Sequence, residues 1–242
     1  GDIHGDLVQL LAMLGKLPPL TAEDTLVFLG DYLDRGPSSA GVVHFLRFTL
    51  PGQTAAKLVF LRGNHEDAWL RVCDVGWEAF LLPPRNGCLA AYRSWTGGEQ
   101  PRFDELPTEE EWARMEDGDF LPDDVVAWMR ELLWWYEDDH AIYVHAGLPW
   151  HAGRWLHPAE VSERQHLVWT RKLEFFTDYR GKTVVVGHTT TGTLPPELDG
   201  LTPGDPEDVW MGAGVWALDT GCGKGGFLTC LQLPDQVVYD TR

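Results

Sequence analysis

Five short polar loops carry the residues of this chain that could do chemistry. Each loop combines Gly with Asp, His or Asn, and four of the five follow an apolar run; the loops are GDIHG at 1–5, GDYLDRG at 30–36, RGNHE at 62–66, HAG at 145–147 and GHT at 187–189. Loops at the strand ends of an open α/β sheet gather at one edge, where ligands bind. We therefore expect the five loops to meet at a single site.

Six side chains in these loops are suitable metal ligands: Asp2, His4, Asp31, Asn64, His145 and His188. Asp2 and His4 are two positions apart, so both point to one side of an extended chain. Carboxylate, amide and imidazole ligands together suit Mn, Fe or Zn. Six ligands are too many for one ion with open positions, but they suit two ions that share Asp31. Two ions about 3.5–4 Å apart can polarise a phosphoryl group and activate a bridging water.

The other polar residues of the loops fit the same task. His65, beside Asn64, could protonate a leaving oxygen as a general acid, and Asp34 could orient its ring. Glu66 either supports a ligand or places negative charge at a helix N-terminus, and the sequence leaves both readings open. Three arginines could bind phosphate oxygens through paired hydrogen bonds: Arg35, Arg62 and Arg171.

Strands and helices alternate between these loops. Apolar runs predict strands at 25–29, 57–61, 141–144 and 183–186, the first two buried on both faces. Spacing and end signals predict helices at 7–14, 40–48 and 123–134. The irregular stretch 72–122 predicts short helices and loops, with a cap beside the site, and 215–239 predicts consecutive strands. This pattern favours an α/β fold in one domain, 1–242.

The start of the sequence leads to one further expectation. A metal-binding Asp at a strand end needs that strand to position it, and the chain begins only one residue before Asp2. We therefore expect a short apolar strand to precede Gly1 in the natural protein.

Charge and hydropathy argue against several classes of partner. The chain of 242 residues has 37 acidic and 19 basic side chains, a net charge of −18 that repels nucleic acid and anionic lipid. No apolar run reaches the roughly 18 residues of a membrane span, and no export signal opens the chain. We expect a cytoplasmic protein, monomeric by default.

The four cysteines favour free thiols over a structural site. None of Cys73, Cys88, Cys222 and Cys230 forms a C-x-x-C pair, which argues against a thiolate zinc site. Free thiols are the default in a reducing cytoplasm. Cys222 and Cys230 could approach each other, which the sequence does not decide.

These blocks resemble the phosphoprotein phosphatase (PPP-type) family of calcineurin-like metallophosphoesterases, especially bacterial members similar to bacteriophage lambda phosphatase. The family pattern GD-x-HG, GD-x-x-DRG, GNH-E, HAG and GH stands here as GDIHG, GDYLDRG, GNHED, HAGLP and GHT. Order and spacing agree along the whole chain. The resemblance implies a four-layer sandwich of two mixed β-sheets flanked by helices, with the first strand missing.

The resemblance also implies a role for each candidate residue. Asp2, His4 and Asp31 would form a first metal set, and Asp31, Asn64, His145 and His188 a second metal set. His65 would be the general acid with Asp34 behind it, and phosphate would contact Arg35, Arg62 and the Arg171 of a W-x-R block. A metal-bridging water would attack phosphorus in line without a phospho-enzyme, and we expect Mn, with Fe or Zn as alternatives.

Two departures from the family pattern concern the substrate side. Bacterial members often have Asn-Gly-Gly where this chain has Asn86-Gly87-Cys88. The resemblance is also weak at 94–120, where a substrate-selecting surface could differ.

Three functions remain open at this point. The leading one is a serine/threonine phosphomonoesterase, whose substrate is a phosphorylated protein or a small phosphoester. The second is a diadenosine tetraphosphatase or related nucleotide hydrolase of the same fold, although such enzymes typically have Gln where His4 stands. The third is an inactive binding scaffold, although such relatives usually lose a ligand or the acid, and here all are present.

Overall fold

The computed structural model describes all residues from Gly1 to Arg242. Its helices are α1 Leu7–Lys16, α2 Ser39–His44, α3 Asn64–Val75, α4 Glu78–Leu81, α5 Cys88–Thr96, α6 Glu109–Met115, α7 Asp123–Glu131, α8 His166–Trp169 and α9 Leu173–Asp178. Its strands are β1 Thr25–Phe28, β2 Lys57–Phe60, β3 Trp135–Glu137, β4 Ile142–Val144, β5 Trp150–His151, β6 Arg154–Trp155, β7 Val184–Thr190, β8 Trp210–Met211, β9 Val215–Asp219, β10 Thr229–Gln232 and β11 Val237–Asp240.

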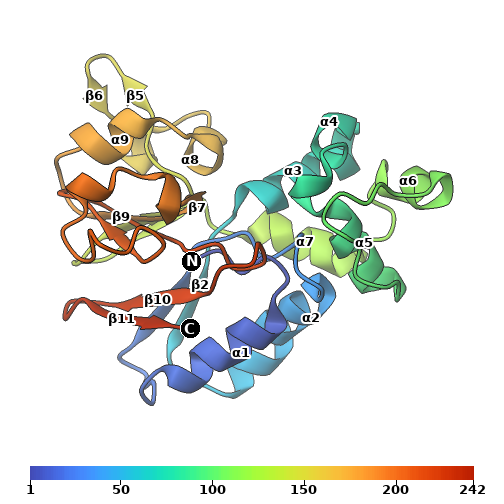
Figure 1. Cartoon of the computed structure of the whole chain (residues 1–242), viewed down its shortest axis with the longest axis horizontal. Helices are drawn as coiled ribbons and strands as arrows, with labels where there is room; N and C mark the ends of the chain where they lie inside the picture. The colour runs from blue at the N-terminus through green and yellow to red at the C-terminus, as the bar shows by residue number, and fades with distance from the viewer.

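The expected mixed sheets are present. The largest has the order β3-β4-β7-β9-β8, with parallel pairing from β4 to β9 and an antiparallel strand at each edge. β1 and β2 form a separate parallel pair, and β10 and β11 form an antiparallel hairpin. Figure 1 shows this hairpin between α1 and the sheet that contains β7 and β9. In place of the second sheet of the predicted sandwich, the structure therefore has two separate pairs of strands, β1-β2 and β10-β11.

The burial expected for the first two strands is wrong for both, since each has only one fully buried residue. Leu26 and Val27 are only partly buried, because they line an apolar cavity of about 570 Å³ that also touches β10. In β2 only Val59 is fully buried. The strand expected before Gly1 lies outside the described residues and stays a prediction.

Two predicted helices differ from the expectation, one in where it ends and one in its helical geometry. The helix at 123–134 stops at Glu131, because the following residues leave it to pair with the end of β2: Leu133 donates to the carbonyl of Phe60 at 3.1 Å. Its own carbonyl accepts from the N–H of Arg62 at 2.7 Å. The helix at 40–48 keeps α-helical geometry only in α2 and continues as a wider π-helical turn over Phe45–Thr49.

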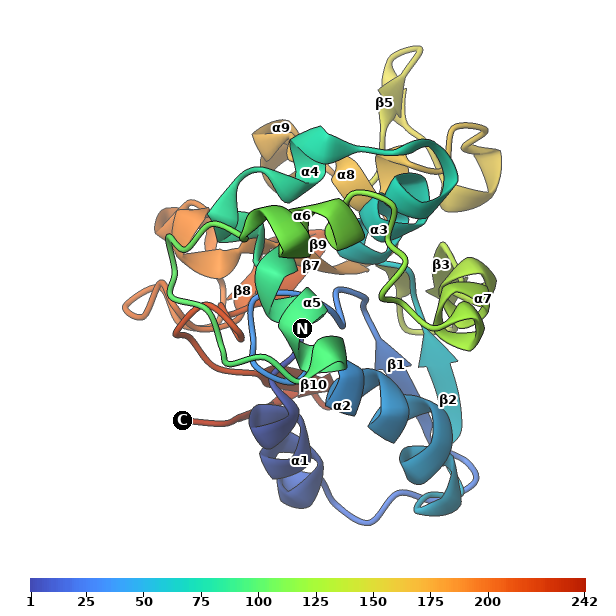
Figure 2. The same cartoon turned by 90° about the vertical axis from the view of Figure 1, so that its right-hand side faces the viewer.

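The middle segment forms the short helices and loops that the sequence predicts. Figure 2 shows α4, α5 and α6 gathered on one side of the molecule, beside α3. No helix in the structure combines the length and the apolar character that a membrane span requires.

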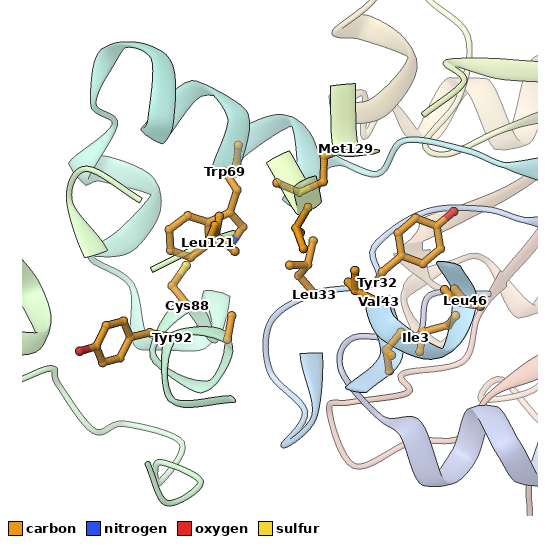
Figure 3. Packing of buried hydrophobic residues seen from close by; sticks show 14 of the residues in the cluster. Ile3, Tyr32, Leu33, Val43, Leu46, Trp69, Cys88, Tyr92, Leu121 and Met129 are labelled. Atoms are coloured by element: carbon orange, nitrogen blue, oxygen red, sulfur yellow. The ribbon is translucent and has the colours of Figure 1, made fainter. Parts of the chain in front are cut away.

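The principal hydrophobic core anchors the loop after β1. This core contains 29 buried residues, and Figure 3 shows Tyr32 and Leu33 within it, near Met129 of α7 and Val43 of α2. The hydroxyl of Tyr32 donates to the carbonyl of Leu61 at 2.8 Å. Two apolar side chains thus fix the short loop that places Asp31 and Asp34 at the site.

Candidate metal centre

The two carboxylate oxygens of Asp31 face two different imidazoles. Oδ1 lies 3.4 Å from Nε2 of His145, and Oδ2 lies 3.4 Å from Nε2 of His4. Asp31 lies in the loop after β1, His145 directly follows β4, and His4 precedes α1. All three side chains are buried. Segments far apart in sequence therefore meet at one carboxylate whose oxygens point in two directions.

Asn64 brings the second metal set together. Its Oδ1 lies 2.7 Å from Nδ1 of His188 and 3.1 Å from Nε2 of His145. Asn64 is the first residue of α3, and His188 lies within β7. Ligand atoms of Asp31, His145 and His188 all lie within 4.8 Å of one another. Four potential ligand atoms thus surround one small volume.

Within the first metal set, Asp2 lies farther from His4 than Asp31 does. Oδ2 of Asp2 lies 3.7 Å from Nε2 of His4, and both oxygens of Asp2 accept from the N–H of His188, at 3.0 and 3.1 Å. The group whose ligand atoms lie within 4.8 Å of one another here consists of His4, Asp31 and His65. Asp2 therefore lies at the edge of this group and braces the backbone of the second set.

Backbone hydrogen bonds fix the tautomer of two imidazoles. Nδ1 of His145 lies 2.8 Å from the carbonyl oxygen of Leu29, and Nδ1 of His4 lies 3.0 Å from that of Leu33. Because a carbonyl only accepts, each Nδ1 carries the hydrogen and each Nε2 presents a lone pair. These lone pairs face the oxygens of Asp31 and Asn64. A cation between such facing acceptors would stabilise them, so the side chains fit divalent metal ions.

The electrostatics of the site favour cations in the same way. Burial lowers the pKa of His4 and of His188 well below the usual range, so both rings stay neutral as ligands must. Burial also raises the pKa of Asp2, and the carboxylates of Asp219 and Asp31 raise it further.

His65 is held on one side by a carboxylate. Nδ1 of His65 lies 2.5 Å from Oδ2 of Asp34, and the indole N–H of Trp69 donates to Oδ1 of the same carboxylate at 2.9 Å. The remaining nitrogen, Nε2, lies 3.9 Å from Oδ2 of Asp31. A ring oriented in this way keeps Nε2 available for proton transfer at the centre.

Arg35 lies against the first metal set and is held by the middle segment. Its Nη1 contacts Nε2 of His4. Its backbone N–H donates to Gly87 at 3.2 Å, and its carbonyl accepts from Nε2 of Gln100 at 2.8 Å. The irregular segment after α3 therefore helps to position this guanidinium at the centre.

The guanidinium of Arg62 binds the end of α7. Its Nη2 donates to the carbonyls of Met129 and Arg130, at 3.0 and 2.8 Å, and its guanidinium lies over the ring of Trp134 at 4.3 Å. The last carbonyls of a helix lack partners within the helix and attract cations. Arg62 thus satisfies the end of α7, and the structure does not bring it to the ligands.

Arg171 lies beside the second metal set. Its Nη1 donates to the backbone carbonyl of His188 at 3.1 Å. Two residues earlier, the indole N–H of Trp169 donates to Asp67 of α3 at 2.9 Å. The W-x-R block therefore joins the loop after α8 to the site.

Five of the predicted site residues adopt a left-handed backbone conformation: His4, Asp31, Asp34, Arg35 and His188, with φ of 46, 54, 71, 66 and 64°. Such conformations cost non-glycine residues about 1–3 kcal/mol each and cluster at functional sites. The surrounding structure must hold these backbones in place, which supports a functional reading of the loops.

A model of the calcineurin-like phosphoesterase family matches residues 1–191, a stretch that contains every predicted ligand. The chain belongs to the calcineurin-like phosphoesterase family. The family resemblance that the motifs predicted is confirmed.

Matches to individual members of this family are shorter. A serine/threonine-protein phosphatase of Candida albicans is 39% identical over 69 residues, which cover 27% of this chain and 22% of that protein. A symmetrical bis(5'-nucleosyl)-tetraphosphatase of Yersinia pestis is 41% identical over 66 residues, covering 27% and 21%. The chain spans about a fifth of the length of the curated relatives it matches.

Solved structures agree on the phosphoesterase fold. A provisionally named diadenosine tetraphosphatase superposes with a TM-score of 0.56 at 21% identity, covering 100% of this chain and 90% of that one. A cold-active protein-tyrosine phosphatase of Shewanella gives 0.51 at 16% identity, covering 100% and 78%. At these identities the likeness shows the fold alone.

Glu66 braces the loop that carries Asp31. Its carboxylate accepts from the backbone N–H groups of Asp31, Tyr32 and Gly63, at 2.9, 2.8 and 2.9 Å. Burial and the nearby Asp31 raise the pKa of Glu66 to about 8. Of the two readings that the sequence left open, these contacts favour support of a ligand loop.

The sequence interpretation missed two charged residues in this phosphoesterase site. Asp219 is fully buried at the end of β9, and Lys224 lies 2.9 Å from it in a glycine-rich loop. Asp219-Thr220-Gly221 stands at the end of an apolar strand, as four of the five predicted loops do. That same pattern could have identified Asp219, whereas nothing in the sequence pairs it with Lys224.

Proposed function

We propose that this protein hydrolyses phosphate monoesters with two divalent metal ions, and that phosphorylated serine or threonine in proteins is its main substrate. The observation that carries the proposal is Asp31, whose oxygens face His4 on one side and His145 on the other at 3.4 Å each. A pair of cations would use both directions of that carboxylate. Membership of the phosphoesterase family gives the reaction class.

Two metal sets share Asp31 in this proposal. Asp2 and His4 complete the first, and Asn64, His145 and His188 complete the second. We choose Mn, with Fe or Zn as alternatives, because the ligands combine carboxylate, amide and imidazole without thiolate. When bound, the ions supply Lewis acidity: they polarise phosphoryl oxygens and make a water molecule more acidic.

The protein's own residues then complete the reaction. Arg35 and Arg171 bind the phosphoryl oxygens from the two sides on which they lie. Water attacks phosphorus in line with the ester oxygen, and the bond between phosphorus and that oxygen breaks. His65 gives the proton on Nε2 to the leaving oxygen, while the Asp34 carboxylate on Nδ1 stabilises the charged ring that precedes this transfer.

Diadenosine tetraphosphate hydrolysis is the second candidate. It is favoured by the match to the Yersinia pestis tetraphosphatase, which covers 27% of this chain, as does the match to the Candida albicans phosphatase. His4 supports the monoesterase instead, because the nucleotide hydrolases of this fold typically have Gln at this position.

A substrate panel separates the candidates. We would measure kcat/KM with Mn for a phosphothreonine peptide, a phosphotyrosine peptide, diadenosine tetraphosphate and p-nitrophenyl phosphate, using Asp31→Asn as the inactive control. The proposal predicts that the phosphothreonine peptide is preferred. Faster turnover of the dinucleotide would move the assignment to the second candidate, and no hydrolysis with Mn, Fe or Zn would identify a binding scaffold.

A cytoplasmic location forms part of the same proposal. All four cysteines are free thiols in the structure, as expected in a reducing compartment. Burial raises the pKa of Cys88, which keeps it a neutral thiol packed near the carbonyl of Phe80.

A further inference from the structure

The loop from Gly221 to Gly226, which we call the glycine loop, packs on the backbone of the first metal set. Sγ of Cys222 lies 3.3 Å from the carbonyl oxygen of Ile3. A Cβ atom added to Gly223 would lie 2.5 Å from Cβ of His4 and 2.7 Å from its carbonyl oxygen. Only glycine allows this approach, because Gly223 also has a φ of 72°.

The glycine loop is fixed from within by a buried carboxylate. Oδ1 of Asp219 accepts from the N–H of Gly221 at 3.1 Å, and Oδ2 accepts from Nζ of Lys224 at 2.9 Å. The hydroxyl of Thr190, two residues beyond His188 on β7, donates to the same Oδ2 at 3.2 Å. Asp219 thus ties the loop to the strand that supplies a ligand of the second metal set.

A third contact joins the glycine loop to the start of α1. Nε2 of Gln9 donates to the carbonyl of Gly226 at 3.1 Å and to Oδ2 of Asp6 at 3.2 Å. Asp6 caps α1, so the helix that follows His4 is held by the same loop. The loop therefore contacts the N-terminal segment at Ile3, His4 and Gln9.

We propose that Asp219 and Lys224 are a positioning pair that holds the glycine loop against His4 and so sets the geometry of the first metal set. This inference rests on the metal-dependent activity proposed above. Lys224 serves as the partner of a fully buried carboxylate, and removing one member of such a pair leaves an uncompensated charge. Residues that support metal ligands in this way typically change metal affinity about 10- to 100-fold when replaced.

Two variants, each with a neutral side chain in place of a charged one, distinguish a positioning role from a purely electrostatic effect on cation binding. Lys224→Met adds net negative charge near Asp2, which would tighten cation binding if charge alone mattered. Asp219→Asn removes negative charge and would weaken binding by the same logic. A positioning role instead predicts that each variant lowers the affinity for one of two Mn ions by about 10-fold or more. It also predicts that the double variant binds Mn little more weakly than either single variant.

The measurements are Mn binding by calorimetry and the spin-coupled signal of a Mn pair by electron paramagnetic resonance, with circular dichroism as the check on folding. Lys224→Arg should restore both readouts. Lys182→Met and Glu137→Gln remove an ion pair of the same 2.9 Å length on the surface and should change neither. If Lys224→Met and Asp219→Asn do not fold, Gly223→Ala shifts the loop without changing charge and should cause the same loss of one ion.

Opposite effects of Lys224→Met and Asp219→Asn, or unchanged Mn binding in both, would overturn the positioning role. A parent protein that binds no Mn would instead refute the proposed function, so the two failures are distinguishable.

Discussion

Asp34 and His65 form a buried pair in which Oδ2 of the carboxylate lies 2.5 Å from Nδ1 of the ring. The carboxylate is held in turn by the indole of Trp69. The ring therefore has one nitrogen committed to Asp34 and one directed to the metal centre. This orientation fits a proton donor and leads to the first prediction.

Replacing His65 should affect catalysis more than metal binding. We expect His65→Asn to lower kcat by about 10²–10⁴, the usual contribution of a general acid, with the metal content unchanged. The readouts are kcat for p-nitrophenyl phosphate and metal analysis. His166→Asn, at an exposed position on α8, is the control. Loss of one metal from His65→Asn would place His65 among the ligands, as its closeness to Asp31 and His4 allows.

Arg35 and Arg62 should behave differently although both lie in phosphatase motifs. Arg35→Ala should lower kcat/KM without loss of metal or of stability, since its guanidinium lies at the centre. Arg62→Ala should instead lower the free energy of unfolding by about 2–3 kcal/mol, because charged hydrogen bonds to the end of α7 are lost.

Denaturant unfolding and steady-state kinetics of the two arginine variants test this contrast. Arg130→Ala, which removes an exposed ion pair with Asp74, is the control for stability. An Arg62→Ala protein of normal stability with the kinetic defect of Arg35→Ala would return Arg62 to the phosphate clamp.

Glu66 should matter for stability and metal binding together. Glu66→Ala leaves the backbone N–H groups of Asp31, Tyr32 and Gly63 without their acceptor, and we expect the free energy of unfolding to fall by about 3 kcal/mol or more. Mn affinity should fall as well, because the loop that presents Asp31 loosens. Glu78→Ala, exposed on α4, should leave both values unchanged. Normal Mn affinity in Glu66→Ala would show that Asp31 is positioned without it.

The middle segment should loosen in acid. Hydrogen bonds from Arg93 hold the pKa of Glu111 below its ordinary 4.5. A carboxyl whose pKa is lowered by folding stabilises the folded state above its unfolded pKa and loses that contribution as pH falls through the folded pKa. Hydrogen-exchange protection at 97–111, corrected for intrinsic rates, should therefore fall below pH 4.5. Arg93→Met should show the low protection already at neutral pH; protection that is independent of both pH and Arg93 would contradict this account.

The sequence predicted the elements that carry the site better than their surroundings. The loops after β1 and β4 and the segment GHT within β7 each combine glycine with a ligand after an apolar run. Their meeting could therefore be predicted from their position at strand ends. The end of α7 could not be predicted, because tertiary pairing of Leu133 with Phe60 competes with helix propensity. That pairing also brings Arg62 beside the end of α7, and its phosphate role stays a prediction.

Residues that act through other residues were the least predictable. Lys224 is 5 positions from Asp219 and 220 from His4, and only the folded glycine loop brings the three together. Gln100 reaches the carbonyl of Arg35 from a stretch where the family resemblance was weak. The single-domain organisation and the individual site roles stay predictions, to be tested by the variants above.

A titration of metal-free protein with Mn tests the central claim most directly. Bound Mn and hydrolysis of p-nitrophenyl phosphate would be followed together, in the parent protein and in Asp31→Asn. Because Asp31 is shared, the account predicts that activity saturates at two Mn per chain and that Asp31→Asn loses both Mn binding and activity. Full activity with one Mn, or hydrolysis that persists after chelation, would contradict it.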